Sequence, residues 1–443
     1  MAGAWYYEST KETAAGISMT KPTHRMILTT SIGALLALVG PLVEAGTLVD
    51  QARQAMAKAG RYWATQVASH GGYVWEYSTD LVTRRRGESG DLPPSTCWVQ
   101  PPGTPAVGQA LLGAYEATGM QLYLDAAVAA AHCLAWGQLQ SGGWTYHIEF
   151  DRQRNRYRYH HLDPQTTPGY DRLDNTSTFD DDTTQSVTRF LMAVDQYVDD
   201  PRIDAALDRA FACFLAAQYR GGVWDGAWPQ QYPLPATGYG RLPTYNDNTM
   251  SDCVRTMLAA YQQYGQRDHL DAVQRCLEFY LRSQLPAPQA GWAQQYDKEP
   301  APRATAATAA VEAAASAAPG PTDETLKPAP ARKFEPAAVT AGESSGNLQL
   351  LMDMYVEFGD PRYLDAVGRA IDWYRRARIG GTPEHGIWAR FYELGTNRPL
   401  YFTRTYQLVY TDDDLPVHYS FQGNFGVDEQ IRRYEEIRER GRE

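Results

Sequence analysis

The stretch LLGAYEATGMQLYLDAAVAAAHCLAWGQLQSGGW, residues 111–144, decides the fold class. Apolar residues recur in it at helical spacing, for example at Leu111 and Tyr115 in the first half and at Leu124 and Leu134 in the second. That spacing is typical of amphipathic helices that pack against other helices. The stretch therefore predicts a helix, a short turn, a second helix and a glycine-rich end.

The same organisation occurs again along the chain. Residues 190–224, 257–292 and 350–381 have it, and a shorter copy begins at Ala52. Because a helix pair covers only its neighbours, a row of such pairs is stable as a solenoid or as a ring. We expect the ring, in which no end is exposed. The predicted fold is all-α, an (α/α) toroid of repeated antiparallel helix pairs with short β and loop elements at the active-site mouth.

The composition fits a large globular protein. The 443 residues are 43% hydrophobic and 21% charged, with a formal net charge of -11. Nucleic-acid-binding proteins usually carry a clustered basic face, so we expect no nucleic-acid partner, and we expect a monomer. The basic run of residues 151–161 is either a solvated loop or a wall that attracts an anionic chain.

The N-terminal residues have the form of a secretion signal. Lys21 and Arg25 precede an apolar run that starts at Met26 and ends at small residues around Ala45, which is the order found in signal peptides. The residues before Met19 fit this order poorly. Met19 or Met26 is therefore an alternative start, and an uncleaved anchor is an alternative to cleavage.

These features predict the domain organisation. Residues 1–45 hold a signal peptide and an upstream segment, and residues 46–443 form one catalytic toroid that is secreted or periplasmic, without stable membrane association after cleavage. Residues 301–330 are rich in Ala and Pro and predict a low-complexity insertion without chemistry. The five cysteines form no Cys-x-x-Cys pair, so the sequence indicates neither a zinc site nor a complete disulfide framework.

Acidic residues gather just before the first helices of the predicted pairs. FDDDTTQS, residues 179–186, has three consecutive aspartates, and YNDNTMSD, residues 245–252, contains Asp247. One aspartate before a helix is explained by capping and by the helix dipole, but three exceed that need. If the first helices form an inner ring, both loops open on one mouth and make a hard-oxygen site suited to Ca²⁺. We predict Asp180, Asp181 and Asp247 as metal ligands.

Seven motifs follow one another along the chain between about Trp98 and Tyr419. They are DDDTTQSVTRFL, GAWPQQYP, YNDNTM, GWAQQYD, PARKFEP, GESSG and ARFYELGTNRPLYFTR. Together and in this order they resemble the pectate lyases of polysaccharide lyase family 10. The resemblance implies an (α/α) toroid enzyme that cleaves polygalacturonate, an acidic polysaccharide, by β-elimination with the help of calcium.

The resemblance also implies roles for individual residues. Asp180 and Asp247 match the calcium-site carboxylates of the family, Arg332 in PARKFEP matches the arginine proposed as the catalytic base, and Arg404 in YFTR matches an arginine that holds a substrate carboxylate. The predicted substrate contacts are Asp180, Trp228, Arg390, Arg404 and His418. The sequence departs from the family where FDDDTT replaces a DNGAT-like loop and where His418 stands near a family arginine. The exact uronic acid is therefore left open.

β-Elimination of a 4-linked uronide begins with removal of the C5 proton beside a carboxylate. That proton is very weakly acidic while the carboxylate is charged, and Ca²⁺ with a forked arginine contact would neutralise this charge. The base is harder to assign, because a guanidinium normally stays protonated. Crowding by the metal and a second arginine is expected to lower the pKa of Arg332. The alternative bases are Lys333, Tyr245 and His418.

Three other functions stay open from the sequence. Triterpene cyclases share the toroid and have an Asp-rich DxDD acid, but Phe179 stands where that motif needs its first aspartate. A glycoside hydrolase could use Asp180 and Asp247 as paired carboxylates. A non-catalytic glycan-binding ring could stack a polymer on tryptophans that otherwise plug the repeats structurally. These tryptophans are Trp144, Trp228, Trp292 and Trp388.

Overall fold

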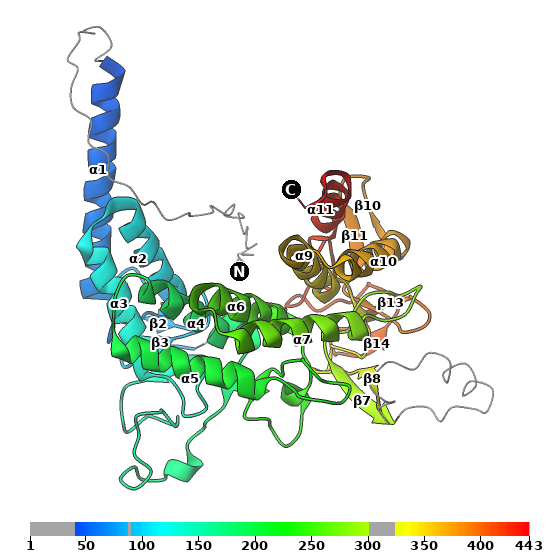
Figure 1. Ribbon diagram of the computed structural model, residues 1–443, viewed down its shortest axis with the longest axis horizontal. Helices are drawn as coiled ribbons and strands as arrows, with labels where there is room; N and C mark the ends of the chain where they lie inside the picture. Colours follow the sequence, from blue (N-terminus) through cyan, green and yellow to red (C-terminus); the bar gives the residue numbers. More distant parts are fainter. Residues whose placement is uncertain (1–39, 87–89, 301–323, 443) are drawn as a thin grey trace. The chain divides into compact units, whose positions relative to one another are not determined.

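The structure, a computed structural model, describes residues 40–86, 90–300 and 324–442. By its internal contacts the chain forms two compact units, Met1–Arg53 and Gln54–Glu443. The fold described below belongs to the second unit (Figure 1). Most of the predicted signal, residues 1–39, lies outside the described residues. No helix in the described ranges combines the length and the hydrophobicity that crossing a membrane requires.

The predicted helix pairs are confirmed. They are α2 (Thr104–Thr118) with α3 (Gln121–Trp136), α4 (Thr183–Asp195) with α5 (Pro201–Ala217), α6 (Thr249–Tyr264) with α7 (Arg267–Ser283), and α9 (Ala341–Phe358) with α10 (Pro361–Ala377). Before these pairs lies α1 (Gly40–Tyr62), which continues into a π-helical turn at Trp63–Val67.

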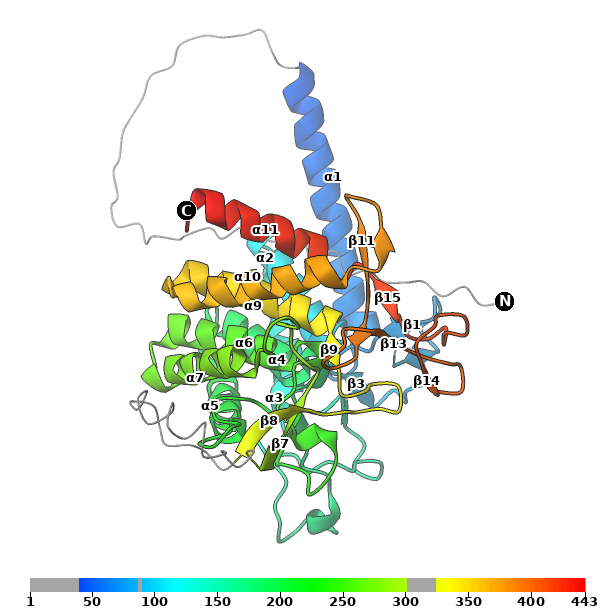
Figure 2. The ribbon, with the colours of Figure 1, turned by 90° about the vertical axis from the view of Figure 1, so that its right-hand side faces the viewer.

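The pairs form the (α/α) toroid that the sequence predicts. Helices α2, α4, α6 and α9 contact one another in this order and make the inner layer, while α3, α5, α7 and α10 contact one another in the outer layer. A further helix, α11 (Val427–Arg440), packs on α9 and α10. Figure 2 shows α11, α10, α9 and α6 in successive layers. The sequence VDEQIRRYEEIRER of α11 is mostly charged and belongs to none of the repeated pairs, but its few apolar residues recur at helical spacing from Val427 to Ile437 and pack on the core.

Local chemistry explains where the helices begin and end. Gly119, Gly265 and Gly359 follow three of the inner helices with φ values of 69°, 70° and 74°, a left-handed conformation that glycine adopts without steric cost. Asp200 and Asp360 precede α5 and α10, and each side chain accepts a hydrogen bond from the backbone N–H two residues on. A proline follows each of these caps, as is favoured at the first helical position.

A glutamine joins each repeat to the next. The side-chain nitrogen of Gln138 donates to the carbonyl oxygens of Gly142 and Ala206 at 2.6 and 2.8 Å, and its oxygen accepts from Arg209. The same bonds recur at Gln218 with Gly226, Ala272 and Arg275, and at Gln284 with Ala290, Ala366 and Arg369. Each amide therefore fixes the end of one outer helix to the next outer helix.

Tryptophans plug the repeats from inside. Trp228 is 0% exposed, and its indole N–H donates to the carbonyl oxygen of Phe214 at 2.8 Å. The other three bond in the same way to the second helix of their own repeat, Trp144 to Leu134, Trp292 to Tyr280 and Trp388 to Tyr374. Their structural interpretation is confirmed. The prediction that Trp228 contacts substrate is wrong, because burial leaves no face of its ring for a sugar.

Short antiparallel strands precede the inner helices and close the C-terminal region. The two-stranded sheets are β1 (Glu76–Tyr77) with β2 (Arg84–Arg85), β3 (Thr96–Trp98) with β4 (His147–Glu149), β5 (Ser177–Thr178) with β6 (Gln231–Tyr232), and β7 (Tyr296–Pro300) with β8 (Glu324–Pro328). The larger sheets have the orders β10 (Gly380–Gly381), β11 (Gly386–Ala389), β15 (Gln422–Gly423), and β14 (Leu408–Val409), β13 (Pro399–Phe402), β12 (Phe391–Tyr392), β9 (Val339–Thr340). Since β5 and β9 lead into α4 and α9, strands hold the N-terminal ends of these helices.

The predicted insertion, residues 301–330, extends too far toward the C-terminus. Residues Glu324–Pro328 form β8, which pairs with β7 so that Pro300 lies opposite Glu324. The Lys298 ammonium lies 2.9 Å from the Glu324 carboxylate across this hairpin. This strand lacks the alternation of apolar and polar residues by which a sequence predicts a strand. The rest of the insertion, residues 301–323, lies outside the described residues.

The basic run of residues 151–161 forms a loop tied to the body by its tyrosines. Tyr159 is 1% exposed, and its hydroxyl accepts a hydrogen bond from the backbone N–H of Glu149 at 2.7 Å. Arg154 lies 3.5 Å from Asp151 within the loop. The solvated-loop interpretation accounts for these contacts, and attraction of an anionic chain stays a prediction.

Candidate active site

Two loops with the same backbone conformation begin α4 and α6. The 3-10 turn η3 (Asp180–Asp182) places Asp181 at φ 51° and ψ 34°, and η5 (Asn246–Asn248) places Asp247 at φ 49° and ψ 33°. The next residue is left-handed in both loops. Such values are uncommon outside glycine and cost least for Asp and Asn. Because η3 and η5 contact each other, the aspartates of two repeats meet at one mouth.

The three predicted metal ligands come together at this mouth. Asp180, Asp181 and Asp247 each offer one carboxylate oxygen, and these oxygens lie within 4.8 Å of one another. The third consecutive aspartate, Asp182, is not part of the group. Both of its oxygens accept hydrogen bonds of 2.6 Å from Arg189. The aspartate run therefore separates into two site residues and one structural residue.

Burial and mutual repulsion disfavour the charged state of these carboxylates. Burial and then repulsion from Asp180 raise the pKa of Asp181 to about 6. Burial, followed by repulsion from Asp180 and Asp181, raises the pKa of Asp247 to about 8. Part of the Asp247 residue is exposed to solvent. Repulsion from Asp180 and Asp181 therefore explains its raised pKa more firmly than burial does. A bound cation would relieve this repulsion directly.

One oxygen of Asp180 has no protein partner. Its Oδ2 accepts a hydrogen bond from the Tyr146 hydroxyl at 2.9 Å, while its buried Oδ1 has no partner among the described residues. Buried polar atoms normally have a partner. A cluster of carboxylate oxygens with an unpartnered acceptor is the donor set that Ca²⁺ prefers, so these residues fit the predicted ion.

A second polar group lies in the first turn of α9. Glu343 Oε1 accepts from the side-chain nitrogen of Gln294 at 3.1 Å and lies 3.8 Å from Arg390 Nη1. The same nitrogen of Gln294 donates to Asn246 Oδ1 at 2.9 Å. Glu343 Oε2 and Gln294 Oε1 are buried without a partner among the described residues. Because Glu343 also contributes to the raised pKa of Asp247, it belongs to the same charged mouth.

Arg332 acts electrostatically on the acidic cluster and is held by Glu335. Its Nε donates to Glu335 Oε2 at 2.7 Å, and its Nη2 pairs with the other carboxylate oxygen. Burial raises the pKa values of Asp180, Asp181 and Asp247, and the charge of Arg332 offsets part of this rise. The hydrogen bond to Glu335 in turn raises the pKa of Arg332. The buried Glu335 carboxylate stabilises the charged guanidinium and so opposes the lowering expected from a bound metal and a second arginine, which stays a prediction.

Arg390 and Arg404 lie in different surroundings. Arg390 Nε donates to the carbonyl oxygen of Ser420 at 2.7 Å, and its guanidinium lies 4.5 Å from the centre of the Tyr419 ring. The side chain of Arg404 is 70% exposed and pairs with Asp414 at 3.3 Å. Within the described part of the chain, no contact joins Arg404 to the acidic cluster. Arg390 thus borders the cluster through Glu343, and Arg404 does not.

One of the alternative bases is excluded by burial. Tyr245 is 3% exposed, its hydroxyl shares a 2.6 Å hydrogen bond with Ser283, and burial raises its pKa well above the usual value. Lys333 and His418 are exposed. The His418 ring lies 5.4 Å from Phe334, and its Nε2 lies 3.4 Å from the Tyr406 hydroxyl. Roles for these two residues stay predictions.

Sequence reasoning missed three residues of this region. Glu335 stands three positions after Arg332 in PARKFEP, a separation at which an ion pair forms readily, and Glu343 stands in GESSG at the start of an inner helix. Both were therefore detectable. Tyr419 gave no local signal, because its hydrogen bond to Glu335 spans 84 residues.

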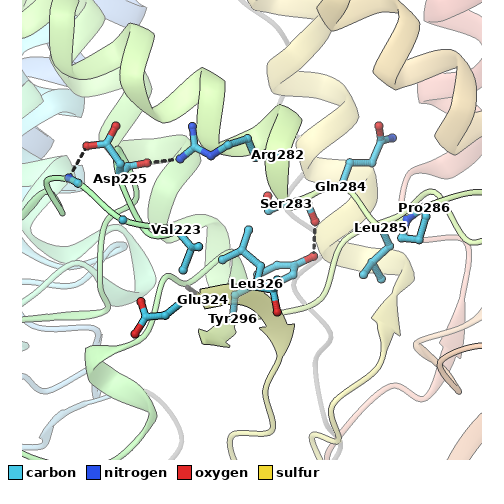
Figure 3. A pocket seen from close by; sticks show the side chains of 13 residues that line it. Val223, Asp225, Arg282, Ser283, Gln284, Leu285, Pro286, Tyr296, Glu324 and Leu326 are labelled. Atoms are coloured by element: carbon cyan, nitrogen blue, oxygen red, sulfur yellow. Dashed lines mark hydrogen bonds between the residues drawn. The ribbon is translucent and has the colours of Figure 1, made fainter. Parts of the chain in front are cut away.

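A cavity of about 780 Å³ lies elsewhere, between the 221–225 loop, the end of α7 and the β7–β8 hairpin (Figure 3). In it the Tyr296 hydroxyl donates to the carbonyl oxygen of Ser283 at 2.7 Å, and Arg282 donates to that of Asp225 at 2.6 Å. None of the predicted site residues lines it. Its size alone does not make it the site of the chemistry.

Carboxylates and arginines from the turns and loops around the inner helices meet at one mouth, which is the arrangement of an (α/α)-toroid enzyme. The chain belongs to the pectic acid lyase family, whose model matches residues 138–260 and 320–428. Together the two matched ranges cover more than half of the chain. The chain is therefore a polysaccharide lyase.

Solved structures agree with this fold. The family 10 polysaccharide lyase from Cellvibrio cellulosa is 21% identical with a TM-score of 0.50, covering 71% of this chain and 92% of that chain. A variant of that lyase in complex with trigalacturonic acid gives the same identity and TM-score over 69% and 92%. The resemblance to family 10 is confirmed. A comparison with curated proteins returned no match.

Proposed function

We propose that this lyase cleaves polygalacturonate, or a closely related polyuronate, by calcium-assisted β-elimination. The observation that carries the proposal is the group of three carboxylates within 4.8 Å of one another, with Arg332 acting on it. A polyuronate carries one carboxylate per sugar, which three bare aspartates would repel. A cation held between protein and substrate carboxylates converts this repulsion into attraction.

Asp180, Asp181 and Asp247 are the residues that would hold the calcium ion. When bound, the ion supplies positive charge that neutralises the uronate carboxylate and stabilises the enolate-like transition state. The Oδ1 of Asp180 supports this assignment, since it is a buried acceptor to which no described residue donates a hydrogen bond. Binding and chemistry are therefore expected to depend on the same three side chains.

Arg332 is the proposed acceptor of the C5 proton. The electrons of the C5–H bond form the C4–C5 double bond, the C4–O bond breaks, and the leaving oxygen takes up a proton. Arg332 must lose a proton before it can accept one, and Glu335 opposes that loss. We therefore expect activity to rise with pH on the alkaline side.

Other residues are proposed to hold the polymer. Arg390 lies over the Tyr419 ring and beside Glu343, from where its guanidinium can make a forked contact to a uronate carboxylate. Arg404 and His418, which are exposed, are proposed contacts to sugars farther along the polymer. A substrate of polymer size supports the predicted secreted or periplasmic location. A monomer without stable membrane association after signal cleavage stays a prediction.

Mass spectrometry of the reaction products tests the proposal. Elimination leaves an unsaturated end that is lighter by one water molecule than the end left by hydrolysis. We expect unsaturated oligouronates from polygalacturonate with calcium and none with a chelator. Saturated products would contradict the proposal and favour the glycoside hydrolase alternative, in which Asp180 and Asp247 serve as paired carboxylates.

A further inference from the structure

Glu335 is a buried carboxylate whose hydrogen bonds converge on Arg332. It is 2% exposed, whereas 46% of the Arg332 side chain is exposed. One oxygen accepts from both the backbone N–H of Arg332 at 3.1 Å and its Nε at 2.7 Å. The other accepts from Arg332 Nη2 and from the Tyr419 hydroxyl at 3.1 Å.

Stability alone is a weak reason for this arrangement. Burying a carboxylate costs hydration energy that an ion pair often does not recover. The pair also leaves half of its arginine in solvent, beside an acidic cluster. A forked carboxylate contact does, however, fix the plane and the direction of a guanidinium, because two parallel hydrogen bonds permit one orientation.

The contacts also leave one nitrogen of Arg332 available. Nε and Nη2 are hydrogen-bonded to Glu335, whereas Nη1 has no hydrogen-bond partner in the described ranges. The aromatic rings of Phe334 and Tyr419 lie 5.0 and 5.6 Å from the guanidinium carbon. These rings limit how far the side chain can swing.

We propose that Glu335, assisted by the Tyr419 hydroxyl, is the positioning residue that fixes Arg332 so that Nη1 meets the substrate. This inference rests on the proposed elimination reaction. Neither Glu335 nor Tyr419 needs to touch the reacting atoms. Their effect is exerted through the orientation and the charge of Arg332.

The charges that face Arg332 come from four segments. Glu335 lies on its own segment and Tyr419 on the C-terminal segment, while Asp180, Asp181 and Asp247 face it from the loops before α4 and α6. Among these groups, Glu335 is the one that is hydrogen-bonded to the guanidinium. Neutralising Glu335 removes the nearest negative charge and leaves the other carboxylates unchanged.

Three variants separate orientation from charge. Glu335→Gln replaces one acceptor of the fork by an amide NH2, so Arg332 loses its fixed orientation and kcat should fall about 100-fold with KM within about twofold. It should also move the alkaline rise of the kcat profile to lower pH by about one unit, since the opposing charge is gone. Glu335→Asp keeps the charge, but its shorter side chain cannot make both hydrogen bonds to the guanidinium. We therefore expect kcat to fall without that pH shift. Tyr419→Phe keeps the ring and should lower kcat about tenfold.

The matched control is Glu278→Gln, which neutralises the exposed partner of Arg362 and should change neither kcat nor the pH profile. Wild-type kcat and an unshifted profile in Glu335→Gln would overturn the inference. If Glu335→Gln does not fold, wild-type kcat in both Glu335→Asp and Tyr419→Phe overturns it instead. A wild-type protein that forms no unsaturated product would overturn the proposed function as well, whereas active wild type with insensitive variants overturns this inference alone.

Discussion

Asp181 and Asp247 are equivalent residues of two successive repeats. Both have left-handed backbone angles that agree to within a few degrees, and both stand one residue before the cap of an inner helix. Asp182 and Asn248 occupy the next equivalent position, also left-handed. The carboxylate cluster therefore arises by repetition of one local structure in adjacent helix pairs, which fixes the two side chains against each other.

Replacing Asp247 by Ala is expected to abolish calcium binding and to lower kcat/KM by about 100-fold or more, because a ligand and its charge are lost. Isothermal titration calorimetry measures the binding, and circular dichroism checks that the helices persist. Asp208→Ala changes an exposed aspartate of α5 and should behave as wild type. Calcium-dependent activity in Asp247→Ala would refute the metal assignment.

Calcium affinity is expected to fall as the pH falls. Without the ion the pKa of Asp247 is about 8 and that of Asp181 about 6, so calcium must displace bound protons below these values. From pH 8 to 6 the Kd should rise about tenfold per pH unit. Calorimetry at several pH values measures this slope, which Asp247→Asn should remove. A Kd independent of pH would count against these raised pKa values.

The same protons predict the stability of the ion-free protein. Folded Asp247 holds its proton up to pH about 8, whereas the unfolded carboxyl releases it near its usual pKa of 3.8. Stability from this group is therefore present below pH 3.8 and is lost as the pH rises through 8. Thermal unfolding in a chelator should show this decline, and calcium should offset it.

Replacing Asp182 by Asn is expected to leave calcium affinity and kcat unchanged. Asp182 pairs with Arg189 rather than with the cluster, and Asn tolerates its left-handed backbone. The half-exposed pair should contribute only about 1 kcal/mol to the free energy of unfolding. Urea unfolding measures this loss. A large fall in calcium affinity would show that the third aspartate belongs to the site.

Replacing residues 301–323 by an Asn-Gly turn is expected to preserve both fold and activity. Pro300 and Glu324 already lie opposite each other in the β7–β8 hairpin, and Asn-Gly is a favoured two-residue connection. The melting temperature and kcat/KM of the shortened protein measure the effect. Loss of either would show that the replaced segment contributes to the enzyme.

The helix pairs and the acidic mouth are predictable from the sequence for a physical reason. Apolar spacing within residues 111–144 specifies which faces are buried, and repetition of that pattern specifies a layered all-α fold. Asp180 and Asp247 are predictable because loops before inner helices open on a common mouth. The role of Asp182 was not predictable, since the direction of its side chain depends on two successive left-handed residues.

Contacts between residues far apart in the chain are the second reason why parts of the structure could not be predicted from the sequence. Helix α11 buries few residues and carries only four apolar side chains among many charged ones, and strand β8 resembles the low-complexity segment that precedes it. Tyr419 reaches Glu335 only through the folded chain. Trp228 lies in a motif shared with a family of sugar-cleaving enzymes, yet its burial makes it a structural residue. Membership in a family motif therefore did not distinguish residues that stabilise the fold from residues that contact the substrate.

The central claim is tested most directly by following the ultraviolet absorbance of the full-length protein with polygalacturonate. The C4–C5 double bond formed by elimination is conjugated to the carboxylate and absorbs, whereas hydrolysis and binding create no such bond. We expect absorbance to rise with calcium, to stop on chelation, and to be absent in Asp247→Ala. Depolymerisation without any rise in absorbance would contradict calcium-assisted elimination.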